Sequence, residues 1–445
     1  MTIKIPEHAQ KAIDLLSQNG YTAYAVGGCI RDSFLEKTPD DWDICTECRP
    51  DEIKRIFSRY RTIDTGIKHG TITVMIDRKL VEITTFRSDG EYENHRKPAH
   101  VEFVTSLQDD LKRRDFTINA MCSKNGIEII DPFGGQKDLK QGIIRCVGDP
   151  SKRFEEDALR ILRGLRFASV LDFEIEKNTK VAMFDKMHLL KCISEERICV
   201  ELKKLICGKA ADKILLEYRD IIAVIIPEIE PCFDFKQNNP HHCYTVWKHI
   251  VKSLSFVRPE PVMRMTMLLH DIEKPKMATV DDNGISHFKK HQYESAQTAA
   301  KILNRLRFDN HSAKYICGLI TEHDNRIPAE MISVKRFISK HGFQFMFDYL
   351  EVRRADTYAQ SDYLRQEKLH ELDELARLTI ELMEEDCCLK LSDLEVNGND
   401  LISLGLSGKQ VGERLRLLLE MVIDGKLQNR KDALLNYIKE SKDVQ

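Results

Sequence analysis

The stretch from residue 24 to residue 43 restricts the fold of this 445-residue chain more than any other. A short apolar run, residues 24–26, ends at Gly27 and Gly28, and glycine lets backbone N–H groups approach a phosphate closely. A helix that starts there and carries Arg31 favours an anion at its first turn. The stretch therefore predicts a strand, a phosphate-binding turn and a helix in immediate succession.

Asp41 and Asp43 flank Trp42 at the end of the same stretch. Side chains alternate between the two faces of a strand, so a strand here would place both carboxylates on one face and the indole on the other. Magnesium typically takes one or two carboxylates and fills its other positions with water and substrate phosphates. The pair predicts a Mg²⁺ site that serves a nucleoside triphosphate. Glu82, in the alternating run 79–86, is a candidate third catalytic carboxylate, with an exposed polar position as the alternative.

Composition limits the class of protein. At 445 residues and 42% apolar, the chain can bury several cores, which predicts two to four domains. Charged residues make up 31%, and no run approaches the ~18 apolar residues of a membrane-spanning helix, so we expect a cytoplasmic protein without membrane contact. Thirteen cysteines without a repeated pattern indicate reduced thiols. The net charge of −3 does not itself predict nucleic-acid binding, although a local basic surface can still bind RNA.

Strand patterns are concentrated near the start of the chain, and helical patterns follow to its end. The predicted strands are 24–26, 70–76, 79–86, 100–104 and 127–130. We expect an α+β fold with four parts: an α/β head at 1–140, a helical neck at 141–230, a helical metal-binding body at 231–360 and a helical tail at 361–445. Residues 87–99 are polar and contain glycine and proline, which predicts a mobile loop of functional length.

Positive charge is concentrated at Lys112, Arg113 and Arg114, directly before an apolar run. This predicts a packed helix start with Arg114 turned inward, where it could bind a triphosphate. Three cations in a row on the protein surface are the alternative.

The segment 154–168 carries apolar residues at the helical period, which predicts one continuous helix with Asp157 and Arg160 a turn apart. A carboxylate only accepts hydrogen bonds and a guanidinium only donates, so a fixed pair matches a base edge with an amino group beside a ring-nitrogen acceptor. Cytosine and adenine have this edge, whereas uracil and guanine would set a carbonyl against the carboxylate. The alternative is an ordinary surface ion pair.

Together these motifs resemble those of the class II CCA-adding enzymes, the tRNA nucleotidyltransferases of the poly(A) polymerase family, whose head is similar to DNA polymerase beta. The resemblance covers nearly the whole chain. The matching segments are 27–32 with 41–43, 113–120, the hinge segment 131–135, the base-reading helix 156–167 and the helix supporting it at 196–201.

The resemblance implies addition of the 3′-terminal CCA of tRNA from CTP and ATP without a template. The tRNA 3′-hydroxyl would attack the α-phosphate, and pyrophosphate would leave. Asp41 and Asp43 would hold the catalytic magnesium. The implied nucleotide-binding residues are Gly28, Arg31, Arg114, Asp157, Arg160, Arg163 and Arg166. Enzymes of the family that add only CC lack the loop at 87–99, so its presence predicts complete CCA synthesis.

A second group of candidate ligands lies beyond residue 235. His249 precedes the adjacent pair His270 and Asp271, and Asp356 follows. This arrangement resembles the HD phosphohydrolase domain, whose metal takes imidazole and carboxylate ligands. The resemblance implies a transition metal such as Ni²⁺, Co²⁺ or Mn²⁺ at these four residues, and a cyclic phosphodiesterase or phosphatase activity. Glu273 stands where the HD family has a small residue, so it would either add a ligand or turn to solvent.

The segment from residue 361 predicts amphipathic helices and resembles the tail with which the family holds the tRNA elbow. No obligate protein partner is evident. Three other functions stay open. The chain could be a poly(A) polymerase that uses only ATP, a partial enzyme that adds only CC or only A, or a phosphohydrolase that keeps the head as a binding module.

Overall fold

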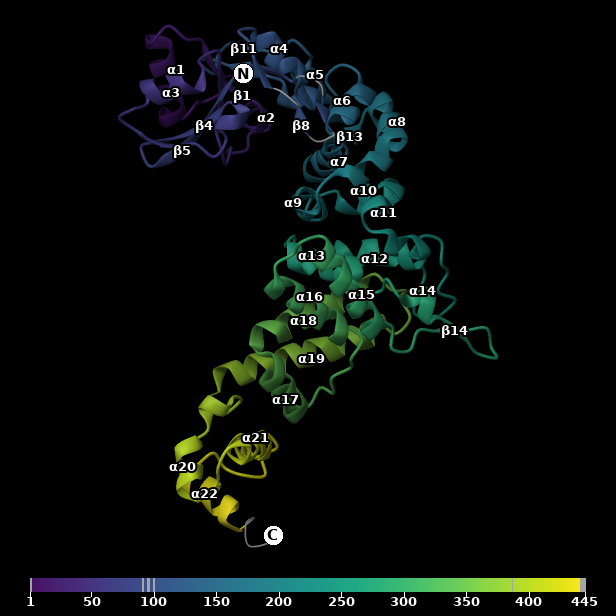
Figure 1. Cartoon of the computed structure of the whole chain (residues 1–445). Helices are drawn as coiled ribbons and strands as arrows, with labels where there is room; N and C mark the ends of the chain where they lie inside the picture. The colour runs from purple at the N-terminus through teal and green to yellow at the C-terminus, as the bar shows by residue number, and fades with distance from the viewer. Residues whose placement is uncertain (1, 90–91, 94–96, 99–100, 386, 441–445) are drawn as a thin grey trace. The chain divides into compact units, whose positions relative to one another are not determined.

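The computed structural model describes residues 2–89, 92–93, 97–98, 101–385 and 387–440 (Figure 1). The chain divides into two compact units, Met1–Glu230 with Arg305–Arg307 and Pro231–Asn304 with Phe308–Gln445. The first unit begins with a mixed α/β head and the second is largely helical, which confirms the predicted α+β class. The division falls at the expected boundary between neck and body, and the finer four-part division stays a prediction.

Seven described strands form the sheet of the head, in the order β11-β10-β1-β2-β5-β4-β3. They are β1 (Ala23–Val26), β2 (Asp43–Thr46), β3 (Arg61–Ile63), β4 (Thr71–Ile76), β5 (Lys79–Thr85), β10 (Cys122–Ser123) and β11 (Ile129–Ile130). β2 and β5 are parallel, and the other neighbouring pairs recorded in this sheet are antiparallel. β4 alternates between buried and half-buried residues, which indicates that one face of the sheet is covered.

Five helices of the head pack on the sheet or connect its strands. They are α1 (Glu7–Gln18), α2 (Gly28–Phe34), α3 (Pro50–Ile56), α4 (Leu107–Lys112) and α5 (Gly135–Gln141), with short 3₁₀ turns at Ile67–His69 and Thr117–Asn119. α1 buries Ala9, Ala12, Ile13 and Leu16, which recur at the helical period and therefore form one apolar face. This face packs against β1, β4 and β5.

The predicted loop at 87–99 is wrong where the structure describes it. β6 (Arg87–Asp89) pairs antiparallel with β9 (Val101–Phe103), and β7 (Tyr92–Glu93) pairs with β8 (Lys97–Pro98). Backbone pairing of its first residues with the strand that follows the segment overrides the polar composition. The remaining residues of the predicted loop, 90–91, 94–96 and 99, lie outside the described residues.

Helices follow the head within the first unit (Figure 1). They are α6 (Pro150–Glu156), α7 (Leu159–Leu171), α8 (Lys177–Lys186), α9 (Glu195–Ile206), α10 (Ala211–Glu217) and α11 (Arg219–Ile225), with β12 (Ile143–Ile144) paired to β13 (Glu174–Ile175) and 3₁₀ turns at Met187–Cys192 and Pro227–Cys232. α7 packs against α9 through buried leucine and isoleucine side chains. Gly164 allows α7 to approach the head closely, because a Cβ there would lie 2.9 Å from the ring of Phe116.

The predicted continuous helix over 154–168 is wrong at Asp157. α6 ends at Glu156, Asp157 is extended (φ −139°, ψ 102°), and α7 begins at Leu159. The N–H of Leu159 donates a hydrogen bond of 3.1 Å to Oδ1 of Asp157. A short acidic side chain that bonds nearby backbone in this way favours a helix start over a helix interior.

The second unit is built from helices around a buried α13 (Pro261–Leu269). The other helices are α12 (Val246–Leu254), α14 (Lys274–Met277), α15 (His291–Arg305), α16 (Asn310–Glu322), α17 (Met331–His341), α18 (Phe343–Tyr358), α19 (Arg365–Glu384), α20 (Gly398–Ser403), α21 (Lys409–Ile423) and α22 (Lys431–Glu440). A short hairpin joins β14 (Thr279–Val280) and β15 (Ser286–His287), and a 3₁₀ turn spans Leu391–Asp393. α13 is buried almost all round, from Met263 to Leu269, so the residues that follow it lie in the interior.

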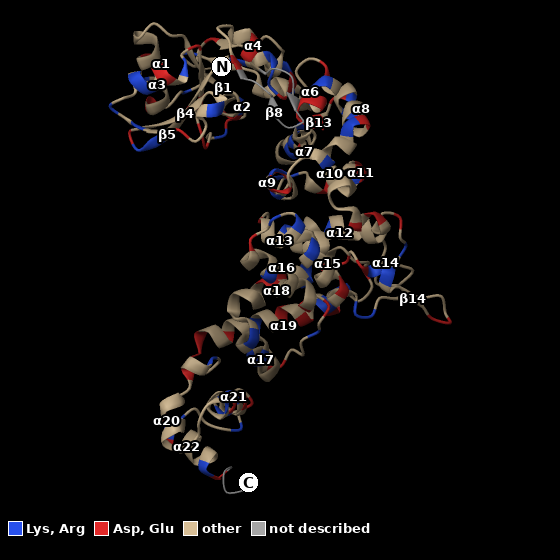
Figure 2. Ribbon diagram, in the orientation of Figure 1, with Lys and Arg blue, Asp and Glu red and all other residues tan. Residues whose placement is uncertain are grey.

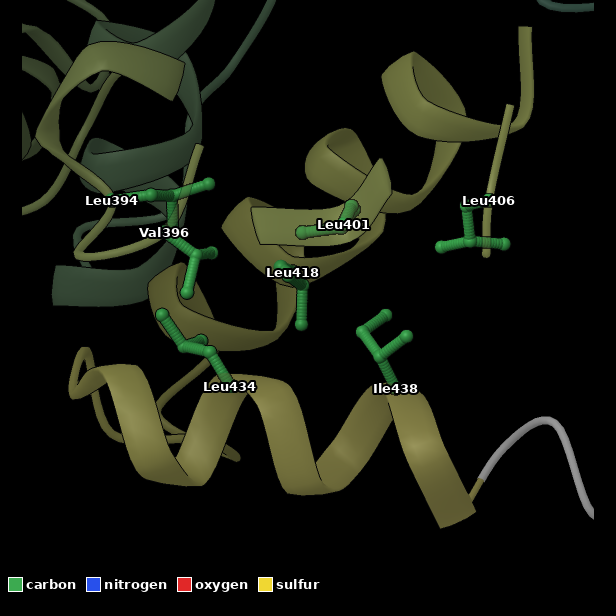
Figure 3. Close-up of a cluster of buried hydrophobic side chains, with 7 residues drawn as sticks. All are labelled: Leu394, Val396, Leu401, Leu406, Leu418, Leu434 and Ile438. Carbon is green, nitrogen blue, oxygen red and sulfur yellow. The ribbon is translucent and has the colours of Figure 1, made fainter. Parts of the chain in front are cut away.

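The last part of the chain has an apolar cluster of its own (Figure 3). It consists of Leu394, Val396, Leu401, Leu406, Leu418, Leu434 and Ile438. Leu434 and Ile438 are four residues apart and therefore share one face of α22. Elsewhere along the helices, acidic and basic residues are interspersed (Figure 2). None of the described helices combines the length and the apolar character needed to cross a membrane.

Candidate active site

A cavity of about 540 Å³ in the first unit collects most of the predicted site residues. Its described lining includes seven arginines and four carboxylates. The arginines are Arg31, Arg87, Arg113, Arg114, Arg160, Arg163 and Arg166, and the carboxylates are Asp43, Glu82, Asp115 and Asp157. Guanidinium groups match phosphate geometry, so the excess of arginine suits a polyphosphate. The volume is in the range of small-molecule sites.

Asp43 and Glu82 form the acidic side of this cavity. They are directly opposite each other in the parallel pair β2 and β5. Burial raises the pKa of Asp43 to about 6, with a further contribution from Glu82 and a smaller one from Asp41, against the opposing charge of Arg114. Carboxylates crowded at a partly buried position are stabilised by a cation. The expectation that the strand carrying Glu82 lies beside Asp43 is confirmed.

The expectation that Asp41 and Asp43 both lie on a strand is wrong for Asp41. β2 starts only at Asp43, where pairing with β5 begins, and Asp41 precedes it in an exposed position. Trp42 is buried, so the alternation of the three side chains holds without a regular strand. Asp41 is not among the residues that line the cavity.

Gly27 and Arg114 meet at the floor of the cavity. Gly27 has φ +84°, and a Cβ there would lie 3.0 Å from Nη1 of Arg114. The positive φ favours glycine, and a Cβ would press on the end of the arginine side chain. Arg114 is turned inward as predicted, but it follows the end of α4 instead of starting a helix. Asp110, which is fully buried, holds the side chains of both Arg113 and Arg114, at 2.6 and 3.2 Å.

Asp110 remains charged in this position. Burial alone would raise its pKa, but Arg114 and Arg113 outweigh burial and lower it. An ionised, buried carboxylate that contacts two guanidinium groups fixes their orientation toward the cavity. Gly28, the first residue of α2, also lines the cavity.

Arg31 is fixed by two neighbours. Its Nη1 donates to Oδ1 of Asn119 at 2.7 Å, and Nε and Nη2 donate to the two carboxylate oxygens of Asp32 at 2.8 and 2.7 Å. Asn119 in turn donates to Asp115 at 3.1 Å. The motif 113–120 thus holds the arginine of α2 in place through its amide and carboxylate.

Three guanidinium groups surround the ring of Phe167 in α7. The centroid lies 4.0 Å from Arg166, 5.0 Å from Arg31 and 5.5 Å from Arg163. Cations over an aromatic face are attracted by its negative potential. The buried ring therefore offsets part of the repulsion among these arginines before an anion binds.

Two carboxylates complete the support of α7. Arg163 contacts Asp115 at 2.6 Å, and Arg166 contacts Glu201 of α9 at 3.1 Å. Burial would raise the pKa of Asp115, but Arg163 and the Asn119 amide together lower it well below its usual range. The helix at 196–201 thus lies against α7, as its resemblance to a supporting helix implied.

Asp157 and Arg160 both line the cavity, but no ion pair between them is recorded among the described residues. Asp157 accepts from Arg197 of α9 at 2.7 and 3.3 Å. Arg160 contacts Glu156 at 2.6 Å and donates to the carbonyl of Arg113 at 2.9 Å. The described contacts thus give each of the two side chains a partner of its own, and the base-reading role of the pair stays a prediction. Both are nevertheless held in fixed positions on the same cavity wall.

A second group of candidate ligands lies in the second unit, and the predicted convergence of His249, His270, Asp271 and Asp356 is confirmed. Their ligand atoms lie within 4.8 Å of one another, and all four residues are buried. Nε2 of His249 lies 2.9 Å from Oδ1 of Asp356. A further group, which shares Asp271, adds two histidines, His291 and His323.

Both expectations for Glu273 are wrong. It is not in either ligand group among the described residues, and only 4% of it is exposed, so it neither adds a ligand nor turns to solvent. Its Oε1 accepts from Lys276 and from Thr298 of α15, each at 2.8 Å. Partners on α14 and α15 therefore hold the carboxylate away from the ligands.

Sequence comparison identifies three family matches. Residues 23–145 match the poly A polymerase head domain. Residues 172–233 match a probable RNA and SrmB-binding site of polymerase A, and residues 290–438 match a putative tRNA nucleotidyltransferase domain 2.

Individual proteins of similar sequence are named CCA-adding enzymes. A CCA-adding enzyme of Ligilactobacillus salivarius is 44% identical over 56% of the chain, and the alignment spans 64% of that relative, somewhat less than two thirds of its length. A CCA-adding enzyme of Bacillus subtilis is 32% identical over 97% of both chains. The chain belongs to the CCA-adding enzyme family. The crystal structure of the Bacillus stearothermophilus CCA-adding enzyme in complex with CTP is 28% identical, with a TM-score of 0.73 and 98% of each chain covered.

Five residues in or beside the cavity of this CCA-adding enzyme family member are not predicted by the sequence as functional. Asp115 and Asn119 lie in the motif 113–120 and Phe167 in the base-reading helix, but no pattern there distinguishes them from their neighbours. Arg197 lies in the supporting segment 196–201, and nothing in that segment indicates its contact with Asp157. Asp110 carried no signal, because an acidic residue on a short helix is ordinarily exposed.

Nucleotidyl transfer in this family implies a divalent cation. The crowded carboxylates Asp43 and Glu82, with the raised pKa of Asp43, fit such an ion in the cavity.

Proposed function

We propose that this chain adds the 3′-terminal CCA sequence to tRNA from CTP and ATP, without a nucleic-acid template and with release of pyrophosphate. The observation that carries the proposal is the single cavity in which paired carboxylates face seven arginines and the Asp157 and Arg160 side chains. Full-length similarity to the Bacillus subtilis CCA-adding enzyme supports it. We place this activity in the cytoplasm.

We propose that Asp43, Glu82 and Asp41 hold Mg²⁺. Bound there, the ion would supply charge stabilisation for the attacking and leaving oxygens. Asp43 is the strongest candidate, because it lines the cavity and Glu82 is opposite it. Asp41 is exposed, yet it is close enough to raise the pKa of Asp43.

The triphosphate would be bound by Gly28, Arg31, Arg114, Arg163 and Arg166. The contacts of these arginines with Asp32, Asn119, Asp110, Asp115 and Glu201 support this role, because anchored guanidinium groups lose little freedom when the anion arrives. The Gly27 conformation keeps Arg114 close to the start of α2. Positioning and charge stabilisation are the main contributions a protein makes to phosphoryl-type transfer.

Base choice would come from Asp157 and Arg160. The carboxylate would accept the amino group of cytosine or adenine, and the guanidinium would donate to the adjacent ring nitrogen. Arg197 would act as a positioning residue, because it holds both oxygens of Asp157. Uracil and guanine would present a carbonyl to the same carboxylate and be rejected.

The RNA partner would be tRNA, bound at its 3′ end near the cavity and at its elbow by the tail. The family matches at 172–233 and 290–438 support RNA binding by the helical parts. We propose complete CCA synthesis, because the segment 87–99 is present. A poly(A) polymerase or a partial CC- or A-adding enzyme is not favoured by any contact in the cavity.

One experiment separates these functions. Purified protein is incubated with tRNA that ends at the discriminator base, together with CTP alone, ATP alone or both. We expect CC from CTP alone, CCA from both, and little product from ATP alone. Poly(A) tails from ATP would overturn the proposal, and a product that stops at CC with both nucleotides would reduce it to CC addition. Shortening 87–99 should convert the complete product to CC, and continued addition of A would refute the role of that segment.

We also propose that the second unit holds a transition metal such as Ni²⁺, Co²⁺ or Mn²⁺ at His249, His270, Asp271 and Asp356. The convergence of their buried ligand atoms supports it, since mixed imidazole and carboxylate sites suit these ions. A phosphatase or 2′,3′-cyclic phosphodiesterase activity would follow from such a site. Metal content after purification tests binding, and loss of cyclic nucleotide hydrolysis in His270→Asn tests the activity.

A further inference from the structure

The order of the strands in the head arranges the cavity residues in a series. The glycine turn follows β1, Asp43 begins the neighbouring strand β2, Glu82 lies on β5 beyond it, and Thr71 lies on β4 beyond that. The carboxylates therefore lie between the glycine turn and the β4 side of the cavity. Thr71, Thr84 and Arg87 line the β4 side, and the triphosphate, cation and base contacts proposed above use none of them.

Thr71 and Thr84 form a pair of hydroxyl groups that lines the cavity. They are directly opposite each other in the antiparallel strands β4 and β5, and their Oγ1 atoms are 2.9 Å apart. Thr84 lies two residues after Glu82, so both side chains are on one face of β5. In such a pair one hydroxyl donates to the other, which leaves the second hydrogen and further lone pairs for a ligand. The pair therefore offers a donor and an acceptor side by side, close to Glu82.

The segment before β4 holds Arg87 beside this pair. Nη1 of Arg87 donates to the carbonyl oxygen of His69, two residues before Thr71. The backbone N–H of Arg87 donates to Oδ1 of the buried Asp110 at 3.4 Å. Gly66 packs closely on the start of β4, because a Cβ there would lie 2.9 Å from Cβ of Thr71. The guanidinium is thus anchored next to the threonines through both its side chain and its backbone.

The geometry of nucleotidyl transfer places the end of the RNA on this side of the cavity. In an in-line displacement, the attacking oxygen and the leaving oxygen are on opposite sides of the α-phosphorus. With the triphosphate bound at the glycine turn and by the arginines of α2 and α7, the leaving oxygen lies on their side of the carboxylates. The 3′-hydroxyl of the RNA must then approach Asp43 and Glu82 from the side of β4.

We propose that Thr71, Thr84 and Arg87 bind the last nucleotide of the RNA acceptor. The threonine pair would hydrogen-bond its 2′-hydroxyl, and Arg87 would pair with the phosphate that joins it to the preceding nucleotide. A 2′-hydroxyl both donates and accepts, as the threonine pair does, and a guanidinium matches a phosphate. This inference rests on the proposed function and deepens it, because it assigns the contacts that position the attacking 3′-hydroxyl.

The first test compares two tRNA acceptors that both carry the 3′-hydroxyl, one of which lacks the 2′-hydroxyl of the last nucleotide. Native protein should add CMP to the ribose end with the higher kcat/KM. This preference should fall about three- to tenfold in Thr84→Val or Thr71→Val, as expected for one neutral hydrogen bond, while the KM for CTP stays unchanged. The intrinsic influence of the 2′-hydroxyl on the attacking oxygen is the same in every variant, so the change in preference measures the contact.

Thr73→Val is the matched control for the threonine pair. Thr73 lies on the same face of β4, is likewise half-buried and is not among the described residues that line the cavity, so the variant should keep the native preference. A preference that is unchanged in Thr84→Val and Thr71→Val would overturn the 2′-hydroxyl contact. If both valine variants lose their circular dichroism signal, native protein decides, because equal rates with the two acceptors would contradict the contact.

The second test replaces the last phosphate of the tRNA acceptor with a neutral methylphosphonate. Native protein should lose about ten- to hundredfold in kcat/KM, as expected for a charge-assisted hydrogen bond, and Arg87→Gln should show little further loss on this acceptor. Arg87→Lys keeps the charge and should restore part of the difference between the two acceptors. Lys68→Gln is the control and should behave as native protein, because Lys68 is exposed beside His69 and is not among the described lining residues.

The outcomes separate this inference from the proposed function. The same methylphosphonate penalty in native protein and in Arg87→Gln would overturn the phosphate contact. Native protein that adds CMP equally well to the normal, the 2′-deoxy and the methylphosphonate acceptor would overturn the whole inference and leave CCA addition standing. Native protein that adds no nucleotide to any of them would overturn the proposed function, and this inference with it.

Discussion

The two candidate cation sites of this chain are built from different ligands. In the first unit, Asp43 and Glu82 offer only oxygen, at the edge of a cavity lined with arginine. In the second unit, four histidines surround Asp271, and their rings are fixed through Nδ1 to backbone carbonyls. Hard carboxylates suit magnesium, and imidazole suits transition metals.

The sites also differ in completeness. Few protein ligands at Asp43 leave room for substrate phosphates, so we expect the cation there to arrive and leave with the nucleotide. At Asp271 the candidate ligands are buried and already gathered within 4.8 Å of one another in each group. We infer that two properties distinguish the sites, the type of ligand and the number of coordination positions that the protein leaves unfilled. A site with many unfilled positions would share its cation with the substrate, and a site with few would keep its cation in the absence of substrate. The predictions below test this distinction.

The largest effect is expected for Asp43→Asn. The amide cannot supply the charge that holds a divalent cation, so nucleotide addition should fall on the order of 10²–10³-fold or more, while tRNA binding changes only a few-fold. Addition is measured with CTP and a tRNA acceptor, and binding by filter retention. The same loss is expected for Asp41→Asn if that exposed carboxylate completes the site.

Asp40→Asn is the matched control, because Asp40 is also exposed, is adjacent in sequence and does not line the cavity. Full activity in Asp43→Asn would contradict the cation assignment of the head. Metal retained by the second unit should be unchanged in all three variants.

A large effect on stability is expected for Asp271→Asn in metal-free protein. Lys274 is buried and lies 2.6 Å from Asp271, so the substitution leaves an unpaired buried charge. Removing one partner of a buried pair typically costs about 3–5 kcal/mol of the free energy of unfolding. Urea denaturation in EDTA measures it. Asp281→Asn, which changes a solvent-accessible contact with His287, should cost far less. Equal costs would mean that burial at Asp271 has no special role.

Base selectivity should respond to both Asp157 and Arg197. Asp157→Ala removes the carboxylate that rejects uracil, and Arg197→Ala releases the same carboxylate from its anchor. A two-point contact with a base gives about 1–3 kcal/mol of discrimination, and we expect a loss of this size in the CTP-over-UTP ratio of kcat/KM. Lys204→Ala, at an exposed position on α9, is the control. An unchanged ratio in Asp157→Ala would show that this residue only supports α7.

Sequence reasoning succeeded where one short segment determines the structure. The glycine turn before α2, the strands β4 and β5, and the His270-Asp271 pair after an apolar helix each follow from local pattern. It failed where the structure depends on a contact with a residue far away in the sequence. The contact of Asp157 with Arg197, forty residues away in the chain, is encoded by no periodicity of the segment 154–168.

The same reason explains why the sequence does not identify His323 as a candidate ligand of the second unit. His323 follows α16 among polar residues and resembles an ordinary helix end. Only the packing of α13, α16 and α18 brings it to Asp271. The prediction for Glu273 is wrong for a related reason. The sequence contains its partners Lys276 and Thr298, but it does not show that they lie beside the Glu273 carboxylate.

The smallest expected effect is on stability, and its sign differs between the two sites: loss of the carboxylate charge should stabilise the metal-free protein at Asp43 and destabilise it at Asp271. Because the folded-state pKa of Asp43 is about 6, above the value of about 4 in an unfolded chain, ionised Asp43 destabilises the metal-free fold increasingly as pH rises from about 4 to about 6. Asp43→Asn should therefore raise the melting temperature in EDTA at pH 7 and not at pH 4. The shift corresponds to about 3 kcal/mol at most, and the partial exposure of Asp43 reduces this to about 1–2 kcal/mol. Thermal unfolding at both pH values, with Asp40→Asn as control, measures it. Added Mg²⁺ and CTP should reverse the order, because only the carboxylate gains from the cation. A variant that is destabilised in EDTA at pH 7 would show that Asp43 contributes to the fold in the same way as Asp271.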